Sequence, residues 1–150
     1  MTYAIEGWRR FLSVILLISF LGMEGELFLL EHTDGFWQVV PMVLLALGTL
    51  SLAAVMTRPG PAALRLLRII MLACVASGAV GVYLHYVGNA AFELEIVPSA
   101  GGWDLFRESL MGATPALAPG AMLQFGLLGL VYAFRHPGSA GTDTTGIPEG

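Results

Sequence analysis

Charged residues and cysteine are both scarce in this chain of 150 residues. Only 12% of the residues are charged, whereas about a quarter are charged in a typical soluble domain. Cys74 is the only cysteine, so the sequence excludes an internal disulfide and a thiolate metal site. Because Cys74 lies in an apolar run, we expect it to be a small, buried packing residue.

Several signatures of function are also missing. The chain has no lysine, and its seven arginines form no basic patch, so it lacks the electrostatic footprint of a nucleic-acid-binding protein. It contains no H-E-x-x-H pair, no glycine-rich phosphate loop and no nucleophile–base motif. Catalysis therefore has little support, and an enzyme acting on a lipid-soluble substrate is only the third alternative.

Apolar residues are abundant instead: they make up 56% of the chain, and the mean hydropathy is +0.76. They gather in four runs, at residues 8–31, 36–57, 66–92 and 116–134. Each run has about the ~20 residues that a helix needs to cross a bilayer, and helices satisfy their own backbone groups there. We expect one all-α domain, a four-transmembrane-helix bundle over residues 1–136, followed by a disordered cytoplasmic tail over residues 137–150.

The arginines predict the orientation of this bundle. Six of them flank the same ends of the runs, at Arg9, Arg10, Arg58, Arg65, Arg68 and Arg135, whereas Arg107 alone lies on the other side. Because positive residues collect on the cytoplasmic side, both termini are expected in the cytoplasm, as for a multi-pass membrane protein. The turn at residues 31–35 and the loop at residues 93–115 would then face outward.

The outer loop has its own predicted structure. Trp103, Phe106 and Leu110 recur at helical spacing between charged residues, which predicts a short amphipathic helix on the membrane surface. The following segment predicts how the fourth span begins.

Thr114 could cap a helix whose first residue is Pro115. Pro119 would remove the donor that bonds back to Pro115, so we expect a kink or a broken first turn there.

Polar residues form a layer near the outer side of the predicted membrane. At a rise of ~1.5 Å per residue, residues on three spans reach a similar depth of roughly 20–24 Å from the inner side. The layer and its continuation outward contain Glu24, Glu26, Glu31, His32, Asp34, His85, Asn89, Glu93 and Gln124. A carboxylate at such a depth costs a few kcal/mol unless it is paired, hydrated or protonated, so this layer is the candidate functional site.

Helical spacing suggests which faces meet. Glu24 and Glu31 share one face of the first span, and His85 and Asn89 share a face with two glycines of the third span. Glycines allow close approach of a neighbouring helix, so we expect these two faces to meet, with Gln124 contributing from the fourth span.

Glu26 points ~200° away from Glu24 and lies on a second face with Ser19 and Gly22. Two interpretations stay open for it. The face could contact another chain, in a homo-oligomer or a larger membrane complex, or Glu26 could simply reach water or be protonated.

Four hypotheses for the layer follow. It could bind a divalent metal ion as a cofactor, through Glu24, Glu31, His85, Asn89 and Glu93. It could carry protons or ions, although the inner halves of the spans are nearly all apolar. It could hold helices together or dock a partner helix. A His32–His85 pair could also ligate haem, but this has weak support.

We take a non-enzymatic, oligomeric or accessory membrane component as the leading interpretation. An ion or divalent-metal transporter is the second, and a membrane enzyme or a haem- or quinone-binding subunit is the third.

Two stretches carry a resemblance to a known family. They are GVYLHYVGNAAFELE (residues 81–95) and GATPALAPGAMLQFGLLGLVYAFRHP (residues 112–137), about a quarter of the chain. They resemble a family of small bacterial four-helix membrane proteins of no known activity. The resemblance implies the same topology and a location in a bacterial inner membrane, and it places His85, Asn89, Glu93, Pro115 and Pro119 among the residues to test first.

Overall fold

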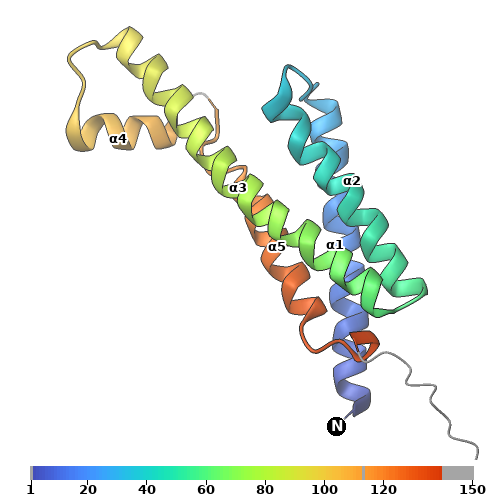
Figure 1. Cartoon of the computed structure of the whole chain (residues 1–150). Helices are drawn as coiled ribbons and strands as arrows, with labels where there is room; N and C mark the ends of the chain where they lie inside the picture. The colour runs from blue at the N-terminus through green and yellow to red at the C-terminus, as the bar shows by residue number, and fades with distance from the viewer. Residues whose placement is uncertain (1, 113, 140–150) are drawn as a thin grey trace, which may run out of the picture.

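The computed structural model describes residues 2–112 and 114–139, and all regular structure in these residues is helical. The elements are α1 (Thr2–Leu29), α2 (Phe36–Thr57), α3 (Pro61–Ile96), α4 (Gly102–Met111), α5 (Gly120–Ala133) and a short 3-10 helix, η1 (Pro137–Ser139). In Figure 1, α1 and α2 form a hairpin, and α3 crosses it at a slant and carries α5 along its lower half. The predicted tail lies, from residue 140 onward, outside the described residues.

Among the described residues, three helices are long and apolar enough to cross a membrane: α1 from Glu6 onward, α2 and α3. The prediction of an all-α chain with long apolar helices is therefore confirmed. At 36 residues, α3 is longer than predicted, because its helix continues through polar residues at both ends. In contrast, α5 has 14 residues, fewer than the ~20 that a bilayer requires, because it begins only at Gly120.

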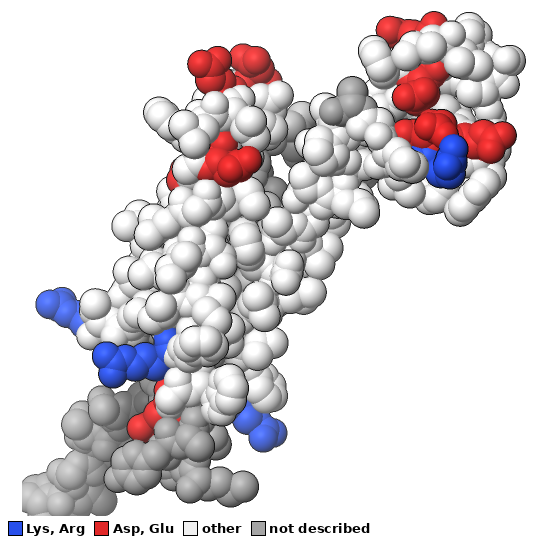
Figure 2. Space-filling model, turned by 180° about the vertical axis from the view of Figure 1, so that it is seen from behind, with Lys and Arg blue, Asp and Glu red and all other residues white. Residues whose placement is uncertain are grey.

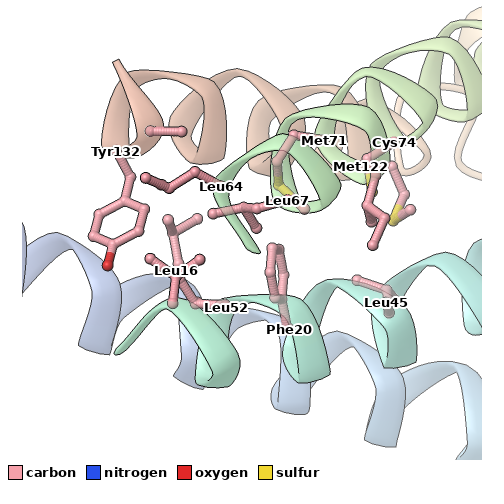
Figure 3. Close-up of a cluster of buried hydrophobic side chains, with 13 residues drawn as sticks. Leu16, Phe20, Leu45, Leu52, Leu64, Leu67, Met71, Cys74, Met122 and Tyr132 are labelled. Atoms are coloured by element: carbon pink, nitrogen blue, oxygen red, sulfur yellow. The ribbon is translucent and has the colours of Figure 1, made fainter. Parts of the chain in front are cut away.

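One cluster of buried apolar side chains joins all four of these helices (Figure 3). Leu16 and Phe20 of α1 pack between Leu45 and Leu52 of α2 on one side and residues of α3 and α5 on the other. The Phe20 ring meets that of Phe125 edge-on, with 5.8 Å between centroids. Cys74 is fully buried in this cluster, as expected for a small packing residue. The cluster fixes the lower part of the molecule as one packed unit.

Glycines set the distance between α3 and α5. A Cβ added to Gly78 of α3 would lie 2.5 Å from the backbone nitrogen of Leu123, and one added to Gly126 of α5 would lie 2.5 Å from the carbonyl oxygen of Met71. Each helix therefore places glycine against the backbone of the other. This is the close approach that small residues permit between membrane helices.

Charges separate along the length of the molecule (Figure 2). Six of the arginines cluster at one end, which we call the basic end, where α1 begins, α2 meets α3 and α5 ends. The opposite, acidic end carries eight of the eleven acidic residues: Glu24, Glu26, Glu31, Asp34, Glu93, Glu95, Asp104 and Glu108. The surface between the two ends is almost uncharged.

The acidic end divides into two arms (Figures 1 and 2). One, the hairpin arm, consists of the turn between α1 and α2 with the adjoining helix ends. The other, the α3–α4 arm, consists of the far half of α3 and α4, which folds back against it. A helix is indeed present at the predicted amphipathic segment, as α4, where Trp103 is 71% exposed.

Candidate functional site

Asn89 is the central hydrogen-bonding residue of the α3–α4 arm. It is only 4% exposed, and its Nδ2 donates to the carbonyl oxygens of Ser109 at 2.9 Å and of Thr114 at 2.7 Å. Its Oδ1 accepts from the Thr114 hydroxyl at 2.6 Å and from the Thr114 backbone N–H at 3.2 Å. A Cβ on Gly112 would collide with Asn89. One amide therefore holds the end of α4 and the start of the α4–α5 link against α3.

Thr114 consequently has a different role from the predicted one. Its hydroxyl donates to Asn89 and does not cap α5, which has Pro119 at its N-cap and no side-chain cap. The link forms i→i+3 turns, with the N–H of Ala118 bonded to the carbonyl of Pro115. Of the two predicted alternatives, the structure shows a broken first turn. The cause is Pro119, which has no backbone donor with which to extend the helix toward Pro115.

The same link orients His85. Its Nδ1 lies 3.2 Å from the carbonyl oxygen of Pro115. A carbonyl can only accept, so Nδ1 carries the proton, and the lone pair of Nε2 stays free in the neutral ring. A backbone carbonyl on one ring nitrogen is the usual arrangement for a histidine whose other nitrogen binds a metal.

His32 is half-buried in the turn of the hairpin arm, whereas His85 belongs to α3. Burial lowers the pKa of His32, and the positive charge that His85 can carry lowers that pKa further. The two imidazoles make no hydrogen bond to each other among the described residues, so the structure does not form the His32–His85 pair considered for haem.

The predicted meeting of the Glu24 face with the glycine face of α3 does not occur. Gly78 and Gly81 pack against Leu123 and Pro119, so α5 and its link occupy the position predicted for α1. Asn89 is likewise occupied, by Ser109 of α4 and Thr114 of the link. The helical spacing correctly identifies the glycine face of α3 as a place of close helix approach. It does not identify the partner helix, because glycine allows any adjacent helix to approach. The glycines of α5 lie against α3 in the same contact.

Glu24 is half-buried, and its Oε2 is shielded from solvent with no hydrogen-bond partner among the described residues. Glu26 is exposed, and a Cβ on the neighbouring Gly22 would meet open space, so the second polar face of α1 is uncovered. Gln124 is also exposed. These three residues do not bond to one another, so they do not form the predicted internal layer.

The other predicted residues lie near the surface of the acidic end. Glu31 and Asp34 are exposed in the hairpin turn, and Glu93 is half-buried on α3. Within residues 2–112 and 114–139, no three His, Cys, Asp or Glu side chains are grouped so that they could hold a metal ion. A single chain therefore presents these residues on two arms and does not collect them into a ready cage.

Sequence reasoning missed the contacts at the basic end. Arg9 donates to the carbonyl oxygens of Tyr132, Phe134 and Arg135 at 2.9–3.0 Å, and Arg68 donates to that of Ala133 at 2.8 Å. The last turn of a helix leaves carbonyls unpaired, so a cation there is favourable. The signal existed, because Arg9 and Arg68 flank apolar runs, but the charge pattern was interpreted only as an orientation marker.

Comparisons with protein-family models, with curated proteins and with solved structures find no match to this chain. Any function must therefore be argued from the geometry of the chain itself.

Proposed function

We propose that this chain is a multi-pass membrane protein of a bacterial inner membrane, and that it crosses the bilayer four times. Three helices of sufficient length and apolarity support this topology. For the fourth crossing, residues 116–134 comprise the turns before α5, α5 itself and its end, which is long enough in sequence for ~20 spanning residues. The charge separation supports placing the basic end, and with it both termini, in the cytoplasm.

At the acidic end, the proposed function is to bind a cationic group, as a non-enzymatic component of a membrane complex. The observation that carries this proposal is the state of Glu24, whose Oε2 is shielded and lacks a partner among the described residues. A carboxylate in this position costs several kcal/mol unless a positive charge or a donor satisfies it.

Other features of the acidic end agree. Among the described residues, the only ion pair joins Arg107 to Glu108, so the remaining carboxylates leave a strong negative field. A partner helix bearing Arg or Lys would meet that field with opposite charge. The uncovered face of Gly22 and Glu26 supports a second contact, between copies of the chain.

A divalent-metal binder or transporter is the second candidate, and His85 favours it. Its Nδ1 contact with Pro115 leaves Nε2 available. Because no three His, Cys, Asp or Glu side chains are grouped among the described residues, the remaining ligands would come from a second chain or from water.

Mass measurement of the complex extracted in mild detergent, combined with elemental analysis, tests both candidates. We expect the wild-type chain to carry a partner, a second copy or a stoichiometric metal, and Glu24→Gln to lose it while keeping its helix content. Glu95→Gln, an exposed carboxylate of the same end, is the matched control and should behave as the wild type.

If metal is present and His85→Ala abolishes it, the second candidate replaces the first. A monodisperse, metal-free single chain that Glu24→Gln leaves unchanged would contradict both.

A further inference from the structure

A recess of about 420 Å³ lies at the basic end, far from the residues of the proposed cation site. The start of α1, the last turn of α2, the end of α5 and the links that follow α2 and α5 form its walls. Its polar lining consists of Glu6, Arg9, Arg10, Ser13, Tyr132 and His136. The rest of the lining is apolar, from the end of α2 and two prolines.

Positive charge dominates this recess. Arg9 and Arg10 both line it, against the single carboxylate of Glu6. Arg9 is fixed in place by three carbonyl oxygens of the α5 end, so its charge cannot move away. The side chain of Arg10 is exposed and makes no hydrogen bond within the described residues, so it is available to a ligand.

The positive charges of the recess also act on His136. Its pKa is lowered by burial and further by the nearby charges of Arg9 and Arg68. Its Nδ1 accepts the Gly138 N–H at 3.1 Å, which requires that nitrogen to be unprotonated. Nε of Arg9 is also shielded from solvent, so Arg9 contributes its charge from within the wall of the recess.

The recess also lies at the level where lipid headgroups are expected. It flanks the point at which α1 becomes apolar, and Trp8, which is 72% exposed, stands at the same level as an interfacial aromatic residue would. Basic pockets between helices at the cytoplasmic side suit the phosphates of anionic lipids.

We infer that this recess binds the phosphate group of an anionic phospholipid, with Arg10 as the side chain that contacts it and Arg9 as a fixed charge behind it. The apolar walls would cover the glycerol and the first carbons of the acyl chains. The choline group of a zwitterionic lipid would instead be repelled by the two guanidinium groups. This inference rests on the proposed membrane orientation but not on the proposed function of the acidic end.

Native mass spectrometry of the full chain can test the inference, with phosphatidylglycerol, phosphatidylcholine and inorganic phosphate as separate probes. We expect the wild type to retain phosphatidylglycerol in preference to phosphatidylcholine. Arg10→Gln should reduce that preference about fivefold, which is the effect of one arginine near an anionic surface. Arg65→Gln is the matched control, since Arg65 is exposed at the same end but does not line the recess, and it should keep the wild-type preference.

A second variant guards against loss of folding as an explanation. Glu6→Gln removes the one carboxylate of the recess and should strengthen the preference for phosphatidylglycerol, a gain that misfolding cannot produce. Equal retention of both lipids by the wild type, or an equal loss in Arg65→Gln and Arg10→Gln, would overturn the inference. So would binding of inorganic phosphate that excludes the lipid, because the site would then serve a free anion. Glu24→Gln should leave lipid retention unchanged, which separates this test from that of the acidic end.

Discussion

The two ends of the molecule are built in opposite ways. At the basic end, Arg9 and Arg68 reach across more than sixty residues of sequence to bind the end of α5, and the buried cluster lies directly next to them. At the acidic end, the long-range hydrogen bonds belong to the α3–α4 arm, whereas those of the hairpin turn join near neighbours such as Asp34 and Gln38. The comparison teaches that long-range hydrogen bonds fix the basic end and the α3–α4 arm, whereas the hairpin arm has only local ones and leaves Oε2 of Glu24 without a partner among the described residues.

The largest effect is expected from disturbing the close contact between α3 and α5. In Gly78→Ala, the new methyl group would meet the Leu123 backbone at 2.5 Å, so the helices must separate. We expect the free energy of unfolding in detergent to fall by about 1–3 kcal/mol, as for overpacked cores.

The matched control for this contact is Gly88→Ala on the same helix, where a Cβ would meet open space. That substitution should be neutral or slightly stabilising, because alanine is the better helix former. Thermal unfolding followed by circular dichroism measures both variants. Equal stability of the two would show that α3 and α5 are not in backbone contact.

The second prediction concerns the α3–α4 arm. Asn89→Ala removes four hydrogen bonds and leaves the carbonyl oxygens of Ser109 and Thr114 without their donor. We expect a loss of about 1–2 kcal/mol, with the damage confined to the arm. Hydrogen exchange should therefore rise in α4 and the link to α5 but not in α1 or α2. A uniform rise along the whole chain would show that the two ends are not independent.

These contacts also show what could be predicted from the sequence. Long apolar runs define α1, α2 and α3, because a bilayer demands many consecutive apolar residues and tolerates little else. A kink or a broken first turn before α5 is predicted because Pro119 lacks a backbone donor, which is a local property. By contrast, the partner of Gly78 could not be predicted. Helical spacing shows which residues share a face of one helix, but it does not show which other helix packs against that face.

The candidate site was less predictable for the same reason. Depth along each helix predicts only that Glu24, His85 and Asn89 lie toward the outer ends of their spans. It could not reveal that Asn89 would be occupied by Thr114, or that His85 would be oriented by a backbone carbonyl. Every residue has a backbone carbonyl, so the sequence does not show which carbonyl will accept a hydrogen bond from a given side chain. Only the folded link between α4 and α5 shows that the carbonyl of Pro115 lies next to His85.

The smallest expected effect is a pH dependence at the basic end. The pKa of His136 is lowered in the folded chain by burial and by Arg9 and Arg68, so the unfolded chain binds a proton more readily. Stability should be fully present above the unfolded pKa of about 6.5 and should decline as the pH falls toward the lower folded pKa. Protonation would also break the bond from the Gly138 N–H to Nδ1.

His136→Asn isolates this contribution, because an amide oxygen can replace Nδ1 as the acceptor but does not titrate. Unfolding temperatures measured from pH 7.5 down to about 5 should fall less steeply in this variant than in the wild type, by a margin smaller than the effect of Asn89→Ala.

Some acid sensitivity should remain, since burial and His85 also lower the pKa of His32 at the opposite end. His32→Asn combined with His136→Asn should remove more of it than either change alone, because the two imidazoles lie at separate ends and their effects should add. The prediction fails if the unfolding temperature depends on pH equally in the wild type and in His136→Asn. That result would mean that burial, Arg9 and Arg68 do not lower the pKa of His136 in the folded chain, so the basic end would be packed more loosely than the structure shows.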